Sequence, residues 1–297
     1  MNILITGGGG GFIGGMLVQE LEKSDHNITL FGHTAPGYPT SAEFIFGDIL
    51  DEEKLAQLGE YDATIHMAGI LGTSVTFGHI KKTAEVNIIG TLNVLERQRH
   101  GGIFIQPNLL GTWLNPYMIT KNAAERFGLM YDNEFPMKYI SIRLTDTFGP
   151  RQSIHHGKAI PTFMKKAIKN EPLPIYGSGE YEMQLLYVKD VAKVFAGTVE
   201  HWESLPRVID IVSSQMDNHI SVASLARKII RLTGSSSELE FMPMRRGQPK
   251  SVTGYDADLD QSQCVMKQLN VVETPHDIAL KETIDWYRYE IESGKLC

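Results

Sequence analysis

The most constraining feature of this 297-residue chain is a cluster near its start, where seven of its 28 glycines fall between positions 7 and 15. The cluster follows the apolar run Met1–Ile5 and precedes the amphipathic stretch Met16–Leu21. A glycine-rich turn between a first strand and a first helix lets backbone N–H groups approach a diphosphate, because no Cβ blocks the way. Gly9-x-Gly11-x-x-Gly14 has the spacing of such dinucleotide-binding turns. A flexible glycine linker is the alternative, but the position between strand and helix favours the phosphate-binding turn.

The rest of the first half alternates short apolar runs, rich in β-branched residues, with helical patterns. We expect strands at residues 3–5, 28–31, 44–45, 64–66, 103–105 and 138–143, and helices at 16–21, 83–96 and 116–131. Strands that are buried on both faces and separated by helices predict a parallel sheet covered on both sides. The expected fold class is therefore α/β, a Rossmann-type doubly wound parallel sheet.

The pattern changes after Arg151, where short strands, helices and turns marked by proline and glycine predict a smaller mixed α/β lobe at the C-terminal side. We place the dinucleotide-binding domain at residues 1–150, with part of 183–212 returned to the sheet. The substrate-binding lobe would comprise residues 151–182 and 213–297.

Charge and cysteine content exclude several classes of protein. The chain has 28 basic and 35 acidic residues, and its net charge of −7 argues against a nucleic acid partner. It shows neither an apolar run long enough for a membrane span nor a secretory signal, so we expect no membrane association. Cys264 and Cys297 are too few for a disulfide framework, which favours a cytoplasmic location. The adjacent His155 and His156 are poorly arranged for shared ligation, and we expect no metal site.

The second expected strand bears on the choice of cofactor. It ends in Gly32-His33-Thr34, where NAD-binding proteins usually carry an acidic residue for the adenosine ribose. The missing carboxylate leaves room for a 2′-phosphate, although no arginine follows to bind one. The expected cofactor is NAD or NADP, with a slight preference for NADP, and His33 is a candidate contact at this end.

Tyr117 and Lys121 stand four residues apart on an expected helix, so their side chains lie on one face. An ammonium beside a phenol favours phenolate, and we expect it to lower the pKa of Tyr117 toward neutral pH. Tyr117 would then serve as a general acid or base beside a nicotinamide ring. The spacing alone is a weak motif, and its value comes from its place after the glycine turn.

Further motifs occur in order along nearly the whole chain. They are Thr6–Gly15, Gly47-Asp48-Ile49, Asp62–Gly69, Asn87–Thr91, Pro116–Lys121, Arg143–Gln152, Leu173–Asp190 and Arg245-Arg246-Gly247. With these motifs the sequence resembles the extended short-chain dehydrogenase/reductase family, the NAD(P)-dependent epimerases, dehydratases and reductases that modify sugar nucleotides.

The resemblance implies a role for each matching position. The cofactor would be bound by Gly8, Gly11, Phe12, Ile13 and Gly14 at the diphosphate, by Asp48 and Ile49 at the adenine, by Met67, Ala68 and Gly69 on the nicotinamide side, and by Lys121 at the nicotinamide ribose, with Asn87 in support. Tyr117 would be the acid/base, and Arg245 would bind the substrate diphosphate. Trp113 and Asp146 are further candidates for the substrate pocket. The helices around 83–97 and 117–131 would form the four-helix interface of a homodimer.

One departure from the family pattern concerns catalysis. Gln106 stands where the family has a catalytic Ser or Thr. We expect Gln106 or Asn108 to donate a hydrogen bond to a substrate oxygen instead, with Thr112 as a less well aligned alternative.

Other departures concern the loops. The phosphate turn is one residue longer than the family's, and the segment between Gly111 and Tyr117 is short. Pro107-Asn108 lacks the acidic pair of dehydratases, so dehydration is disfavoured. Met183-Gln184-Leu185 lacks one arginine of the diphosphate site.

The leading hypothesis is therefore a ketosugar reductase that acts on a nucleotide sugar with Tyr117 as acid/base. An epimerase with retained NAD is the close alternative. A dinucleotide-binding regulator without turnover is a third possibility, motivated by the missing hydroxyl and the short loop.

Overall fold

The computed structural model describes residues 1–111, 113–247 and 257–296. Its main sheet consists of β1 (Asn2–Thr6), β2 (Asn27–Gly32), β3 (Glu43–Phe46), β4 (Ala63–His66), β5 (Ile103–Leu109), β6 (Lys138–Leu144) and β10 (Val208–Ile211). These strands are all parallel and lie in the order β10-β6-β5-β4-β1-β2-β3. The order changes direction between β1 and β4, which is the switch point where doubly wound sheets bind ligands. The predicted fold class is confirmed.

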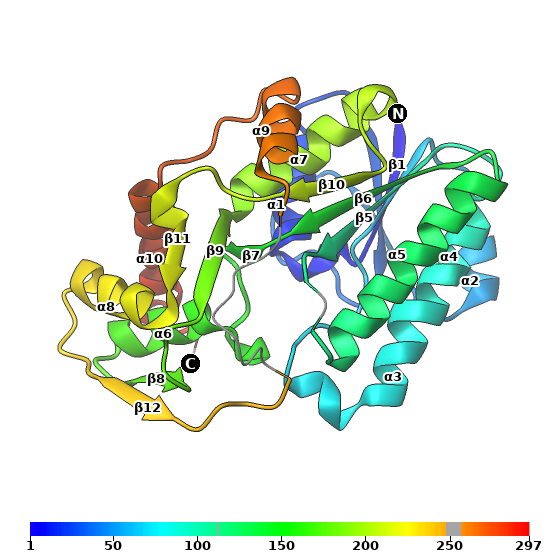
Figure 1. Cartoon of the computed structure of the whole chain (residues 1–297). Coiled ribbons are helices and arrows are strands. Elements are labelled where there is room, and N and C mark those ends of the chain that lie inside the picture. The colour runs from blue at the N-terminus through cyan, green and yellow to red at the C-terminus, as the bar shows by residue number, and fades with distance from the viewer. Residues whose placement is uncertain (112, 248–256, 297) are drawn as a thin grey trace.

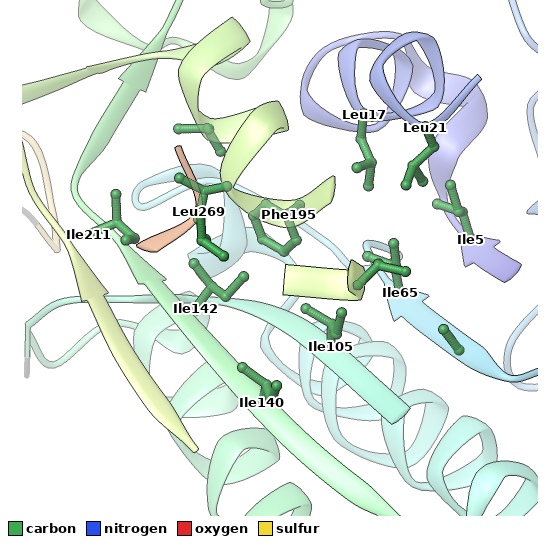
Figure 2. Close-up of a cluster of buried hydrophobic side chains, with 14 of the residues drawn as sticks. Ile5, Leu17, Leu21, Ile65, Ile105, Ile140, Ile142, Phe195, Ile211 and Leu269 are labelled. Atoms are coloured by element: carbon green, nitrogen blue, oxygen red, sulfur yellow. The ribbon is translucent and has the colours of Figure 1, made fainter. Parts of the chain in front are cut away.

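Helices cover both faces of the sheet (Figure 1). One face carries α1 (Ile13–Leu21), α7 (Val188–His201) and α9 (Leu259–Gln268), and the other carries α2 (Glu52–Ala56), α4 (Thr91–Gln98) and α5 (Pro116–Glu134). Figure 2 shows the first of the two cores, which contains Ile5, Leu17, Ile65, Ile105, Ile142 and Phe195. The second core contains Leu4, Val94, Phe104, Tyr131 and Tyr139. Consecutive strand residues point to opposite faces, so both faces must be apolar.

A π-helical segment interrupts the helix that was expected at residues 83–96. The chain runs from α3 (Ile80–Ala84) through η3 (Glu85–Gly90), which is π-helical, into α4. A Cβ at Gly90 would lie 2.5 Å from Cδ1 of Ile49, so the helix passes close to the β3–α2 connection only because this residue is glycine. Such π segments are rare and occur frequently at functional sites.

Outside the main sheet, the described residues form two small sheets. One has the order β11 (His219–Ser221), β9 (Glu182–Tyr187), β7 (Asp146–Phe148), and the other pairs β12 (Leu239–Met242) with β8 (Leu173–Tyr176). The helices α6 (Ala159–Ile168), α8 (Val222–Thr233) and α10 (His276–Glu292) pack around Phe163, Leu225 and Tyr287. Short turns of 3-10 helix occur at η1 (Gly8–Gly10), η2 (Val75–Gly78), η4 (Ile154–His156), η5 (Trp202–Ser204) and η6 (Met216–Asn218). The division into two domains stays a prediction.

None of the helices within the described ranges is both long and apolar enough to cross a membrane. In the same ranges, no group of three or more His, Cys, Asp or Glu side chains is arranged to hold a metal ion. Cys264 is an exposed free thiol. Thr112, Cys297 and residues 248–256 of the predicted substrate lobe lie outside the described residues.

Candidate active site

The glycine turn connects β1 to α1 and has a packed side and an open side. Gly7 and Gly11 have left-handed backbone angles, with φ of 75° and 84°. A Cβ at Gly7 would lie 2.7 Å from Cα of Ala68, and one at Gly14 would lie 2.8 Å from Cα of Gly8. A Cβ at Gly10, in contrast, would have no other atom within 4 Å. The packed glycines hold the turn together, while the open side leaves backbone groups accessible to a ligand.

The extra residue of the turn meets the loop that follows β2. A Cβ at Gly9 would overlap the carbonyl oxygen of Thr34, and the hydroxyl of Tyr38 donates to the Gly8 carbonyl at 3.0 Å. The longer turn thus packs against the β2–β3 loop. The sequence did not predict this contact.

At the end of β2, where the expected acidic residue is missing, a carboxylate from another loop lies beside His33. His33 Nε2 lies 3.2 Å from Oδ2 of Asp48, which follows β3. Both side chains reach solvent, so they can contact a ligand at this corner of the sheet. The side chain of Ile49 is instead buried in the core beneath Gly90.

His66 at the end of β4 is fully buried and ties three elements together. Its Nδ1 lies 2.7 Å from Thr6 Oγ1, and its Nε2 lies 3.0 Å from Thr91 Oγ1. Burial, with a contribution from the charge of Lys121, lowers the pKa of His66 to about 3. A neutral His66 therefore fixes the strand that leads into Met67–Gly69.

Asn87 lies in the π-helical segment η3 and bridges the loop after β4 to α5. Its Oδ1 accepts from the Ile70 N–H at 2.7 Å, and its Nδ2 donates to the Ile70 carbonyl and to Thr120 Oγ1, both at 3.0 Å. Asn87 is itself buried. It thereby positions the loop of residues 67–70 relative to the helix that carries Tyr117, and its supporting role toward a cofactor stays a prediction.

Tyr117 and Lys121 occupy the first two turns of α5, whose start is capped by Asn115. Tyr117 is partly exposed, and burial raises the pKa of its phenol, which corrects the expectation of a lowered value. Lys121 is 8% exposed. Burial lowers the pKa of Lys121 to about 8, although the carboxylate of Glu125 opposes this effect. Near neutral pH the helix therefore presents a protonated phenol and an ammonium group on one face.

Gln106 and Asn108 lie on β5 with side chains that are 1% and 2% exposed. The Tyr139 hydroxyl donates to Gln106 Oε1 at 2.8 Å, and Asn108 Nδ2 donates to Tyr139 Oη at 3.2 Å and to Ser141 Oγ at 2.9 Å. Ser141 donates in turn to Glu125 on α5, so both amides belong to a buried polar network beneath the helix. Their suggested contact with a substrate oxygen stays a prediction.

A pocket of about 180 Å³ opens between the two lobes, and it brings together Trp113, Asp146 and Arg245. The ring of Trp113 packs edge-on against Tyr181, with 6.0 Å between centroids. The Arg245 guanidinium lies 3.5 Å from the ring centroid of Tyr176 and donates to the Gly157 carbonyl at 2.8 Å. Aromatic walls with a few charged groups are typical of small-molecule sites.

Lys158, Tyr176 and Tyr181 also line this pocket, and the sequence did not single them out. Tyr176 could have been found, because it immediately precedes the turn Gly177-Ser178-Gly179 inside a motif of the resemblance. Lys158 sits in a loop without any local signal.

Comparison with known proteins identifies relatives of this chain. A family model described as the NAD dependent epimerase/dehydratase family matches residues 3–110 and 110–211. UDP-glucuronic acid decarboxylase 1 of Xenopus tropicalis is 26% identical, over 98% of this chain and 73% of that protein. UDP-N-acetyl-alpha-D-glucosaminuronate decarboxylase of Bacillus cytotoxicus is also 26% identical, over 98% of each chain.

Solved structures have the same fold. UDP-glucuronic acid 4-epimerase of Bacillus cereus, in complex with UDP-glucuronic acid and NAD, has a TM-score of 0.82 at 25% identity, over 97% of this chain and 99% of that one. UDP-glucose 4-epimerase of Thermotoga maritima has a TM-score of 0.84 at 23% identity, over 98% of this chain and all of the other. The family resemblance is confirmed: the chain belongs to the NAD-dependent epimerase/dehydratase family of enzymes.

Proposed function

We propose that this enzyme transfers hydride between a nicotinamide dinucleotide and a carbon of a nucleotide sugar, with Tyr117 as the acid or base. The observation that carries the proposal is the pair Tyr117 and Lys121 on one face of α5. This helix follows β5, the glycine turn follows β1, and Met67–Gly69 follow β4. All three segments therefore lie at the carboxyl edge of the parallel sheet, beside its switch point.

The residues at this edge fit a dinucleotide. Gly10 and Gly11 face open space, with only the Tyr38 ring 3.9 Å from a Cβ at Gly11, so a diphosphate can approach the backbone there. His33 and Asp48 would contact the adenosine, and Lys121 the nicotinamide ribose. When bound, the nicotinamide supplies or takes up the hydride. The exposed carboxylate of Asp48 beside His33 supports NAD, since it would repel a 2′-phosphate; the preference for NADP stays a prediction.

The protonation state of Tyr117 is compatible with reduction of a ketosugar. Tyrosine is protonated near neutral pH, and burial raises the pKa of Tyr117 further, so its phenol can donate a proton to a carbonyl oxygen. The ammonium group of Lys121 then stabilises the phenolate that remains. In the pocket, Arg245 would bind the diphosphate of the nucleotide, while Trp113 and Asp146 would contact the sugar.

Epimerisation is the second candidate, because the proteins of similar structure include two 4-epimerases of UDP-sugars. An epimerase oxidises its substrate first, which requires Tyr117 to act initially as a base. A retained NAD that stays bound through both half-reactions is compatible with the exposed carboxylate of Asp48.

Mass spectrometry of co-purified nucleotides, followed by turnover assays, tests these candidates. A reductase consumes NADH or NADPH stoichiometrically with a nucleotide-linked ketosugar, whereas an epimerase interconverts sugar isomers without net change in nicotinamide absorbance.

We expect Tyr117→Phe to lower kcat at least 100-fold with the cofactor still bound. Tyr61→Phe, just before β4 at the opposite edge of the sheet, is the matched control.

Full turnover by Tyr117→Phe would show that the catalytic assignment is wrong. A wild-type protein that binds a dinucleotide but turns over no nucleotide sugar would instead support the regulator without turnover.

We also propose that the protein is a homodimer, built on α3, η3 and α5. These adjoining helices expose large apolar side chains in the described chain: Ile80, Ile89, Ile119, Phe127 and Met130. Large apolar side chains exposed on adjoining helices support a protein–protein interface there.

A further inference from the structure

Arg151 is a half-buried arginine with a strained backbone, and no carboxylate of a described residue forms an ion pair with it. It is one of three non-glycine residues with positive φ among the described residues, at 67°. Its guanidinium lies 5.2 Å from the ring centroid of Tyr38, and no oxygen of a described residue accepts a hydrogen bond from it. The other half-buried arginines each donate to an oxygen: Arg97, Arg99, Arg143, Arg207, Arg245 and Arg288. Nη1 of Arg151 is buried without an acceptor among the described residues, and a buried donor of this kind is costly unless a ligand oxygen accepts from the guanidinium.

Arg151 and Tyr38 lie against the glycine turn. A Cβ at Gly15, in the first turn of α1, would lie 2.9 Å from Cε1 of Tyr38 and 3.3 Å from Nη1 of Arg151. The Tyr38 hydroxyl also donates to the Gly8 carbonyl at 3.0 Å. The ring of Tyr38 therefore connects the turn to Arg151 and fixes the guanidinium beside the start of α1.

We propose that Arg151, oriented by Tyr38, binds a phosphate of the dinucleotide whose diphosphate occupies the glycine turn. The inference depends on the cofactor site proposed above and adds to it a residue from the start of the β7–α6 connection. A guanidinium offers parallel donors that match phosphate oxygens. Strained backbone angles are also concentrated at ligand-binding positions. Arg151 thus supplies the positive charge that the turn itself lacks.

Arg151 could bind either of two diphosphates, that of the cofactor or that of the nucleotide sugar. Arg151 is absent from the described lining of the 180 Å³ pocket, whereas it lies beside Gly15 of the turn. The geometry therefore favours the cofactor over the substrate.

Calorimetric binding of NAD, ADP, adenosine and UDP to the full-length protein tests the proposal. For Arg151→Gln we expect at least tenfold weaker binding of NAD and ADP, unchanged binding of adenosine and UDP, and a weaker salt dependence for NAD. Arg151→Lys should recover part of the loss. Tyr38→Phe keeps the ring and should stay within a few fold of wild type, whereas Tyr38→Leu should resemble Arg151→Gln. Arg227→Gln, on an exposed position of α8, is the control.

Ligand-free melting temperatures establish that each variant is folded. Equal affinity of wild type and folded Arg151→Gln for NAD and ADP would overturn the inference and leave the proposed function intact. A selective loss of UDP binding would place Arg151 at the substrate diphosphate and would also overturn it. Failure of the wild type to bind any nicotinamide dinucleotide would instead overturn the proposed function itself.

Discussion

Lys121 is held in a position that disfavours its own charge. Its pKa falls from 10.5 to about 8 because the side chain is buried. At pH 7 the folded protein must keep this ammonium group charged, at a cost of about 3 kcal/mol relative to the unfolded chain. The residue proposed to support Tyr117 therefore reduces the stability of the fold.

We expect Lys121→Met to abolish turnover and to raise the free energy of unfolding at pH 7 by up to about 3 kcal/mol. The folded state binds fewer protons than the unfolded state between pH 8 and 10.5, so wild-type stability rises with pH there and the advantage of the variant shrinks. Urea unfolding from pH 7 to 10.5 measures this change. The exposed Lys23→Met is the control, and an advantage independent of pH would contradict the assignment.

Two neighbouring glycines of the turn should respond differently to the same substitution. Gly9→Ala would overlap the Thr34 carbonyl, so we expect a loss of about 2 kcal/mol or more in stability. Gly10→Ala meets no atom within 4 Å, so its fold should be kept, while NAD binding should weaken at least tenfold if the diphosphate lies over the turn. Thermal melting and calorimetry separate the two effects. Unchanged NAD affinity in Gly10→Ala would place the ligand elsewhere.

The residues of the candidate site differ in how far the sequence could identify them. Tyr117 and Lys121 follow from a local spacing that the helix preserves. Gln106 and Asn108 do not, because a parallel strand is buried on both faces and its pattern does not reveal which side meets a ligand. The burial of the Tyr117 phenol could not be predicted from the sequence either, because it depends on packing against segments that are distant in sequence.

At the scale of elements, the strands β1, β2, β4, β5 and β6 could be predicted because each is a continuous apolar run. The strands β7, β11 and β12 are short, partly exposed and paired only in small sheets, so they carry little periodic signal. The π-helical segment η3 was missed for a different reason. Its apolar spacing resembles that of an α-helix, and the bulge arises where Asn87 bonds to Ile70 and Thr120.

Asn87 should therefore contribute to the free energy of unfolding, because it links η3 to the loop after β4 and to α5. Asn87→Ala leaves the N–H and carbonyl of Ile70 without their partner, so we expect a loss of about 2 kcal/mol or more in unfolding free energy. Asn93→Ala on α4, which loses a single bond to the Ile49 carbonyl, should lose about 1 kcal/mol. Equal losses in urea unfolding of the two variants would show that the bridge adds nothing.

For the whole molecule, the exposed apolar face of α3, η3 and α5 predicts how the chain associates. Ile119 is 52% exposed on α5, so Ile119→Glu should leave the monomer fold intact but bury a charge in the proposed dimer. We expect sedimentation analysis to show at least a 100-fold weaker dimer. Leu232→Glu on α8, at an exposed position outside this face, should keep the wild-type distribution. A wild-type protein that sediments as a monomer at micromolar concentration would refute the interface.

The place of β10 in the main sheet has a consequence for how the molecule is made. β10 lies beside β6, yet the segment between them carries Asp146, Tyr176 and Tyr181 of the pocket. During synthesis, the strands from β1 to β6 leave the ribosome first, and one edge of the sheet stays open until β10 follows. These pocket residues are thus translated after β6 and before β10, which are neighbours in the sheet. When β10 pairs with β6, the two ends of the segment between them are held side by side.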